Sequence, residues 1–448
     1  MLSGRRPALG LALILVAYLA LAWLFATRVP KWNAPDEPAH FNYVRHLAET
    51  GRLPILQVGD YDFHKVEERM AAKFPDSLPV DWMRYESHQP PLYYALAAPV
   101  YLLAARLPME GQVVALRMFS SVLGALGLVV AYLLVRQVFP KDDVLALAVP
   151  SVMAFIPMRV AMYAAVENDA LAELVLSVVL LTLVLGLRGR PRLGHDLVVG
   201  CLLGLALLTK IVAYTAVVLV AVAFLVAELR PSAPEQTTST VGARLRRFAS
   251  RLAVVYLVAA VVSGWWFVRN ALVYGGLDVF GLRRHAVVVA GQPLTGGLTP
   301  QTVRHFAVTA FRSFWAQFGW MGITVDERIY TLLAALCGVA AFGLLIYLAR
   351  VGLTPGVLSP YQRRALPLLV LCPALVAVGV VAYNLSYLQA QGRYFFPSLA
   401  PLSLLFVLGL RELAAREYAG LLLALLSASL FGLTLLCLFR YVVPAFAG

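Results

Sequence analysis

Long apolar stretches alternate with short polar stretches along almost the whole chain. Several of them hold about 18 or more predominantly apolar residues, the length that an α-helix needs to cross the bilayer core. The composition agrees, with 61% hydrophobic and 14% charged residues. The pattern predicts an all-α, polytopic integral membrane protein. We expect about eleven crossings, at residues 9–27, 113–135, 144–163, 169–187, 197–209, 211–227, 252–268, 329–348, 365–384, 394–410 and 419–439.

The net charge of +13 is concentrated in the short loops between the predicted spans. Basic loops of this kind face the cytoplasm, so we expect a cytoplasmic N-terminus and an external C-terminus in the inner (plasma) membrane. The charge therefore orients the chain, and we expect no nucleic-acid partner. The clusters are Arg5/Arg6, Arg136/Lys141, Arg188/Arg190/Arg192, Arg244/Arg246/Arg247/Arg251, Arg350/Arg363/Arg364 and Arg411/Arg416.

Two segments need separate treatment. Residues 91–107 are apolar enough to span, but a crossing there would turn every later basic loop outward, so we expect an interfacial or re-entrant helix. Residues 228–250 are polar and rich in Pro, Ser and Thr, which predicts a flexible cytoplasmic linker.

The chain is predicted to divide into five parts. They are a first span (1–27), an external loop with interfacial helices (28–112), the rest of a transmembrane catalytic module (113–268), a second external loop (269–328) and C-terminal spans (329–448).

The sequence Pro35-Asp36-Glu37-Pro38 directly follows the first predicted span. Unpaired charge near hydrocarbon is costly, so adjacent carboxylates there favour a functional site. Alternatively, Asp36 caps a helix that begins with Pro38 in its first turn. Capping would explain one carboxylate but not two, nor His40 one helical turn later.

Further polar residues lie on the predicted outer side, which indicates a site assembled from several external turns. A carboxylate there can accept a proton from a hydroxyl nucleophile, while Lys or Arg stabilises a phosphate leaving group. These residues are Glu86, His88, Glu167, Asn168, Asp169, Lys210, Arg269, Arg393 and Tyr394.

Each of these residues also has a structural alternative. Asn168-Asp169 suits a helix cap, and His88 suits an exposed turn before two prolines. Lys210 and Arg269 could snorkel to the interface, and Arg393 could anchor a span end there. The residues alone leave both interpretations open.

The order of these motifs resembles the GT-C superfamily of membrane glycosyltransferases, which includes the protein O-mannosyltransferases and the aminoarabinose transferases of lipid A. The resemblance covers nearly the whole chain and is closest to an uncharacterised bacterial branch. The matching elements are Asp36-Glu37, His88-Gln89-Pro90-Pro91-Leu92-Tyr93, Glu167-Asn168-Asp169-Ala170-Leu171, Leu208-Thr209-Lys210, Trp265-Trp266-Phe267-Val268-Arg269-Asn270, Phe314-Trp315-Ala316-Gln317-Phe318-Gly319-Trp320 and Arg393-Tyr394-Phe395-Phe396-Pro397.

The resemblance implies an enzyme that takes a sugar from a polyprenyl-phosphate donor in the membrane lipids. It implies transfer to a glycan, lipid or protein hydroxyl on the external (periplasmic) face. Asp36 would be the general base of an inverting transfer, with Glu37 orienting or ligating. Glu167 or Asp169 would fill a second acidic position.

The same resemblance makes Lys210 and Arg393 the candidates for the lipid phosphate. We count His40, Glu86, His88, Arg269 and Tyr394 as substrate-binding candidates. Superfamily members differ in metal use, so a Mg²⁺ or Mn²⁺ ion held by Asp36, Glu37 and Asp169 stays open.

Two other classes of protein compete with the enzyme. A secondary transporter or lipid flippase would carry charges midway along its spans and broken helices in two matching halves. A non-catalytic assembly subunit would not need clustered polar motifs. We favour the glycosyltransferase because the charges lie at the edges of outer loops.

Overall fold

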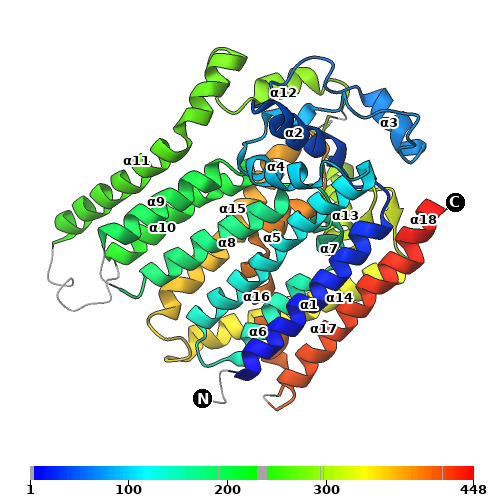
Figure 1. The fold of residues 1–448 in the computed structure, drawn as a ribbon. Helices are drawn as coiled ribbons and strands as arrows, with labels where there is room; N and C mark the ends of the chain where they lie inside the picture. Colours follow the sequence, from blue (N-terminus) through cyan, green and yellow to red (C-terminus); the bar gives the residue numbers. More distant parts are fainter. Residues whose placement is uncertain are drawn as a thin grey trace.

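The computed structural model describes residues 5–189, 192–229, 240–292, 294–295, 297–415 and 417–447. This part of the chain is a bundle of long helices, which confirms the predicted all-α membrane class (Figure 1). The helices that form or contribute to candidate membrane spans are α1 (Arg5–Arg28), α5 (Met109–Val138), α8 (Asp169–Gly186), α10 (Thr215–Leu229), α11 (Val241–Tyr274), α14 (Glu327–Leu353), α15 (Gln362–Asn384), α16 (Leu399–Leu413) and α17 (Ala419–Leu436).

Shorter elements connect or cover these helices. They include two short strands that pair antiparallel, with Gln317 opposite Thr324 and Phe318 opposite Ile323. The shorter elements are α2 (Glu37–Thr50), α3 (Phe63–Ala71), η1 (Tyr85–His88), α4 (Leu92–Ala104), α6 (Asp143–Ala154), α7 (Pro157–Tyr163), α9 (Leu193–Leu207), η2 (Ile211–Tyr214), α12 (Leu282–Val288), α13 (Pro300–Trp315), β1 (Gln317–Phe318), β2 (Ile323–Thr324), η4 (Gly392–Ser398), η5 (Cys437–Val442) and α18 (Val443–Ala447).

Within the described ranges, nine helical segments are long and apolar enough to cross a membrane. The pair α6–α7 supplies a tenth crossing if it is one span, but it bends by 65°. Pro157 begins α7 and lacks a backbone N–H, so it interrupts the helical hydrogen bonds at the bend. The predicted span at 197–209 corresponds to α9, an apolar helix of 15 residues. The described ranges thus hold nine or ten candidate spans against the predicted total of about eleven, because α9 is shorter than the roughly 18 residues of a typical span.

The helix α4 has 13 residues, about 20 Å at 1.5 Å per residue, too short for the bilayer core. It lies across one end of the bundle beside α2, as expected for a segment that does not cross (Figure 1). The N–H of Leu92 donates to the carbonyl of Leu208, 2.9 Å away, which ties α4 to the turn after α9.

The helix α11 corrects the predicted boundary at 252. It begins at Val241 and runs for 34 residues, so the basic cluster at 244–251 is helical rather than part of a linker. Arg251 pairs with Asp196 on α9 and with Glu228 on α10. These ion pairs stabilise a polar helix start that an apolar pattern does not predict. Residues 230–239 of the predicted linker lie outside the described residues.

The basic loops gather at one end of the bundle, which we call the basic end. Arg188 donates to the carbonyl of Gln137, and Arg411 pairs with Asp142, so consecutive basic loops touch one another. Arg190 and Arg416 lie outside the described residues, as do the side chains of Arg5 and Arg6. The segments with Asp36, α2 and α4 lie at the other end (Figure 1), which we call the Asp36 end.

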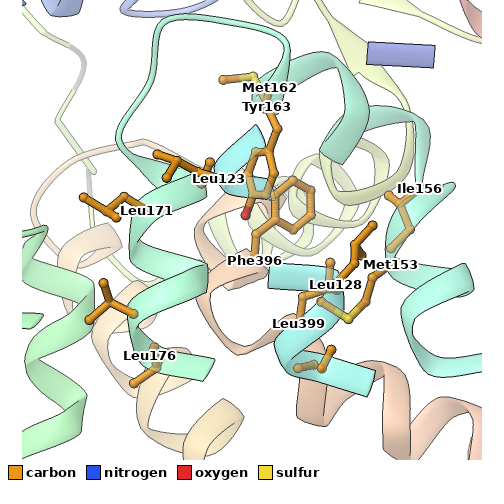
Figure 2. Close-up of a cluster of buried hydrophobic side chains, with 14 of the residues drawn as sticks. Leu123, Leu128, Met153, Ile156, Met162, Tyr163, Leu171, Leu176, Phe396 and Leu399 are labelled. Carbon is orange, nitrogen blue, oxygen red and sulfur yellow. The ribbon is translucent and has the colours of Figure 1, made fainter. Parts of the chain in front are cut away.

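A buried apolar cluster between the two ends positions the site. Figure 2 shows Phe396 of η4 and Tyr163 of α7 at the centre, with Leu123 of α5 and Leu171 of α8 on one side and Met153 and Ile156 on the other. The Phe396 ring also packs edge-on against Tyr163, with centroids 6.2 Å apart. This packing fixes η4, which includes Arg393, relative to α7 and α8.

Candidate functional site

Asp36 lies at the N-terminus of α2 in a left-handed backbone conformation, with φ of 65°. Its side chain makes no capping hydrogen bond, so the helix-cap alternative is wrong for this carboxylate. Instead, the hydroxyl of Tyr85 donates to Oδ1 at 2.8 Å, and Nη2 of Arg393 donates to Oδ2 at 2.5 Å. A left-handed, non-glycine residue whose carboxylate contacts a buried guanidinium is a candidate functional position.

Arg393 is the centre of the site. Its side chain is buried, and Nη1 donates to Oε2 of Glu167 at 3.1 Å. The same nitrogen lies 4.0 Å from Oδ2 of Asp169. Nε donates to Oε1 of Gln391 at 2.6 Å, which orients the guanidinium. The alternative of an interfacial anchor is therefore wrong for Arg393.

Glu167 contacts two further basic side chains. Its Oε1 accepts from Nζ of Lys210 at 3.2 Å, and its Oε2 lies 3.2 Å from Nε2 of His40. Burial opposes ionisation of Glu167, but His40, Lys210 and Arg393 outweigh it and hold its pKa well below the usual range. Lys210 also donates to Oδ1 of Asp169 at 2.6 Å. Glu167 therefore stays ionised and joins α2 to η4.

The neighbouring alternatives do not hold either. Asn168, at the N-cap of α8, makes no capping hydrogen bond with its side chain. Lys210 does not snorkel, because it pairs with Asp169 and Glu167. These two carboxylates raise the pKa of Lys210 by more than burial lowers it, so the ammonium stays charged. Tyr394 is half-buried, and its ring lies 5.6 Å from the guanidinium of Arg393.

His88 and Glu86 lie on η1, above the cluster. His88 is buried rather than exposed, and its ring centroid lies 4.2 Å from that of His285 on α12. Burial lowers the pKa of His88 to about 4, so its imidazole is neutral at neutral pH. Burial raises the pKa of Glu86, and the Asp36 charge adds to this effect. The segment η1 therefore adds a neutral imidazole and a carboxyl group near Asp36.

The structure separates two predicted residues from this cluster. Glu37 is fully buried and pairs with Arg117 of α5, with both oxygens 2.7 Å from the guanidinium. Arg269 donates to the carbonyl of Pro54 at 2.5 Å and packs on the Trp266 ring. Both residues fasten the covering segments to the bundle and do not face Asp36.

Sequence reasoning missed two tyrosines. The hydroxyl of Tyr85 contacts Asp36, and that of Tyr94 lies 2.8 Å from Nδ1 of His40. Both are fully or nearly buried. Their positions beside Glu86 and after the Pro90-Pro91 turn were the available signal.

The proposed metal ligands do not converge. Asp36 faces Arg393, Glu37 faces Arg117 and Asp169 faces Lys210, so each carboxylate already has a cationic partner. Across the described ranges, no group of three or more His, Cys, Asp or Glu side chains could hold a metal ion. As arranged here, the three carboxylates do not fit a Mg²⁺ or Mn²⁺ site.

Comparison with known proteins finds one family match and a shared fold. Residues 88–266 match the family described as dolichyl-phosphate-mannose-protein mannosyltransferase. No curated protein sequence matches the chain. The structure of ArnT from Cupriavidus metallidurans bound to undecaprenyl phosphate is similar, with 16% identity and a TM-score of 0.54 over 97% of this chain and 73% of that one.

An oligosaccharyltransferase from Archaeoglobus fulgidus, solved with zinc and sulfate, is also similar. It has 15% identity and a TM-score of 0.52 over 93% of this chain and 52% of its own, so this chain spans about half its length. At these identities the two structures establish the shared fold. The chain therefore has the fold of these membrane glycosyltransferase structures, and its residues 88–266 match the mannosyltransferase family.

Proposed function

We propose that this protein transfers a sugar from a polyprenyl-phosphate donor to a hydroxyl acceptor, with Asp36 as the general base. The observation that carries the proposal is the difference in exposure among the clustered carboxylates. The Asp36 side chain is 25% exposed, whereas those of Glu167 and Asp169 are 1% exposed. Asp36 is thus the carboxylate of this cluster that an incoming acceptor can reach.

In the proposed reaction the acceptor oxygen attacks the anomeric carbon while its proton passes to Asp36. The bond between the anomeric carbon and the phosphate oxygen breaks, and the lipid phosphate leaves with the electron pair. Arg393 and Lys210 stabilise the negative charge that develops on this phosphate. Arg393 exchanges its contact with Asp36 for the phosphate, which frees the base.

A single accessible carboxylate favours an inverting, single-displacement transfer. A retaining enzyme needs a second carboxylate as nucleophile, about 5–5.5 Å from the first. Glu167 is a poor nucleophile because His40, Lys210 and Arg393 hold its oxygens. The undecaprenyl phosphate bound to the similar ArnT structure supports a lipid-phosphate donor.

The proposed side of the reaction is the external face. The basic end carries Arg136, Arg188, Arg350 and Arg411, and such loops stay in the cytoplasm. The Asp36 end would then face the periplasm. A glycan, lipid or protein hydroxyl could reach it there.

The test compares wild type with Asp36→Asn, using a radiolabelled polyprenyl-phosphate sugar in proteoliposomes. We expect turnover to fall about 10²–10⁴-fold while the donor still binds, because only the base is removed. Undiminished transfer by the variant would refute the assignment of Asp36.

A matched control is Asp76→Asn, which removes an exposed external carboxylate that pairs with Lys31. This variant should transfer sugar at the wild-type rate. A flippase would carry the intact donor across the bilayer without releasing lipid phosphate, so recovery of only intact donor would favour that class instead.

A further inference from the structure

The Asn168 side chain is wholly buried, yet neither Oδ1 nor Nδ2 has a hydrogen-bond partner among the described residues. Asn168 lies between Glu167 and Asp169, which both contact Lys210. A buried amide without partners is costly, and native proteins retain few of them. An unpaired donor and acceptor beside a charged site therefore point to a ligand.

Two carboxylate oxygens of the same site are also unpaired. Oδ2 of Asp169 is buried without a hydrogen bond, since the Nη1 atom of Arg393 is 4.0 Å away. Oε2 of Glu86 is likewise buried and unpaired within the described residues. Glu86 directly follows Tyr85, whose hydroxyl donates to Asp36, so it borders the same site. The site thus offers one amide and two free acceptor oxygens.

The charged centre of the site is, by contrast, well partnered. Both oxygens of Glu167 accept hydrogen bonds, from Lys210 and from Arg393. The unpaired atoms therefore belong to the residues beside the proposed phosphate-binding side chains, Lys210 and Arg393, and not to those two side chains.

We propose that Asn168, Asp169 and Glu86 form a subsite for the hydroxyl groups of a neutral sugar on the lipid-linked donor. The inference rests on the proposed function, because it assigns the sugar end of a donor whose phosphate contacts Lys210 and Arg393. Sugar hydroxyls both donate and accept, so they can satisfy the amide of Asn168 and the free oxygens of the two carboxyl groups.

The same atoms disfavour an acidic sugar. A uronic acid carboxylate would lie beside the ionised carboxylate of Asp169, and like charges in a buried site repel strongly. The subsite therefore selects neutral sugars such as hexoses and N-acetylhexosamines over uronic acids.

The experiment measures binding to the full-length protein in nanodiscs. The probes are decaprenyl phosphate and decaprenyl phosphate linked to mannose, to N-acetylglucosamine or to galacturonate. Wild type should bind its best neutral-sugar probe at least about tenfold more tightly than both the galacturonate probe and bare decaprenyl phosphate.

The variant Asn168→Leu should lose about 10–100-fold in affinity for that neutral-sugar probe. It should bind bare decaprenyl phosphate within about twofold of wild type, which also reports correct folding. The matched control is Ser177→Ala. Ser177, on the same helix, also carries a buried hydroxyl without a partner among the described residues, about two turns from Asp169.

Four results would overturn the subsite. An equal loss on all probes would make Asn168 structural, and no loss would mean that water satisfies it. A wild type that prefers galacturonate, or that does not distinguish sugar-bearing from bare lipid, would also contradict it. If Asp36→Asn loses turnover while Asn168→Leu shows no selective loss, the subsite fails and the proposed function stands. If Asp36→Asn transfers at full rate while the neutral-sugar preference holds, the subsite stands and the proposed role of Asp36 fails.

Discussion

Asp36 and Glu37 are adjacent acidic residues with opposite surroundings. The Asp36 side chain is 25% exposed and shares Arg393 with Glu167. The Glu37 side chain is inaccessible, and its oxygens accept from Arg117 and from the backbone N–H groups of Trp32 and Val166. A substrate can therefore replace a contact of Asp36, whereas both oxygens of Glu37 are held by contacts that a substrate cannot reach.

The difference shows how one acidic motif can serve two purposes. Arg117 also donates to the carbonyls of Ala26, Val29 and Pro30, so the Glu37–Arg117 pair holds the end of α1 against α2 and α5. This clamp fixes the chain immediately before Asp36. Glu37 therefore supports the backbone on which Asp36 is presented.

The largest expected effect comes from breaking the clamp. Glu37→Gln leaves Arg117 as a buried charge without its counter-ion, so we expect the free energy of unfolding to fall by about 3–5 kcal/mol. Thermal melting in detergent measures this loss. Asp36→Asn should melt close to wild type, because Asp36 is partly exposed.

The control for this prediction removes both charges. In Glu37→Leu/Arg117→Met no unpaired charge remains, so the double variant should be more stable than Glu37→Gln. Equal instability of the two variants would show that packing, rather than charge pairing, holds this region.

A smaller effect should follow from Tyr85→Phe, which removes a contact of Asp36 and leaves those of Glu37 unchanged. The Tyr85 hydroxyl orients the Asp36 carboxylate through a hydrogen bond of 2.8 Å. Its loss should lower kcat/KM by about tenfold, the equivalent of one hydrogen bond. Tyr61→Phe, which alters a ring packed against Tyr85, should leave kcat/KM unchanged. An unchanged kcat/KM in Tyr85→Phe would exclude a positioning role.

The smallest expected effect is a loss of local stability at acid pH, in the segments near Asp36 but not around Glu37. Burial lowers the pKa of His88 to about 4 and that of His285 to about 3, so both bind protons more readily when exposed. Local stability is therefore lost as the pH falls below the unfolded value of about 6.5, by about 1 kcal/mol per histidine at pH 5.5. Hydrogen exchange should rise in residues 85–88 and 282–288 and stay constant around Glu37. Constant exchange in both regions would contradict this prediction.

The spans were predictable because a 30 Å apolar core imposes a long apolar pattern. The start of α11 was not, since it depends on ion pairs with Asp196 and Glu228, which lie on other helices. The bend between α6 and α7 was signalled by Pro157, but its angle depends on packing against distant helices.

For the site, topology placed Asp36, Glu167, Lys210 and Arg393 at one end but could not pair them. Their contacts join residues up to 357 positions apart, and no local pattern encodes such pairing. The separation of Glu37 did have a signal. Arg117 lies within a predicted span, and an arginine there requires a buried partner.

The left-handed backbone at Asp36 restricts which residues this position can accept. Among residues other than glycine, Asp and Asn adopt this conformation most readily. Asn at position 36 therefore removes the charge with little strain, whereas Glu would keep the charge on a longer side chain that fits this backbone less well. The shorter acid is favoured by local geometry before any chemistry takes place.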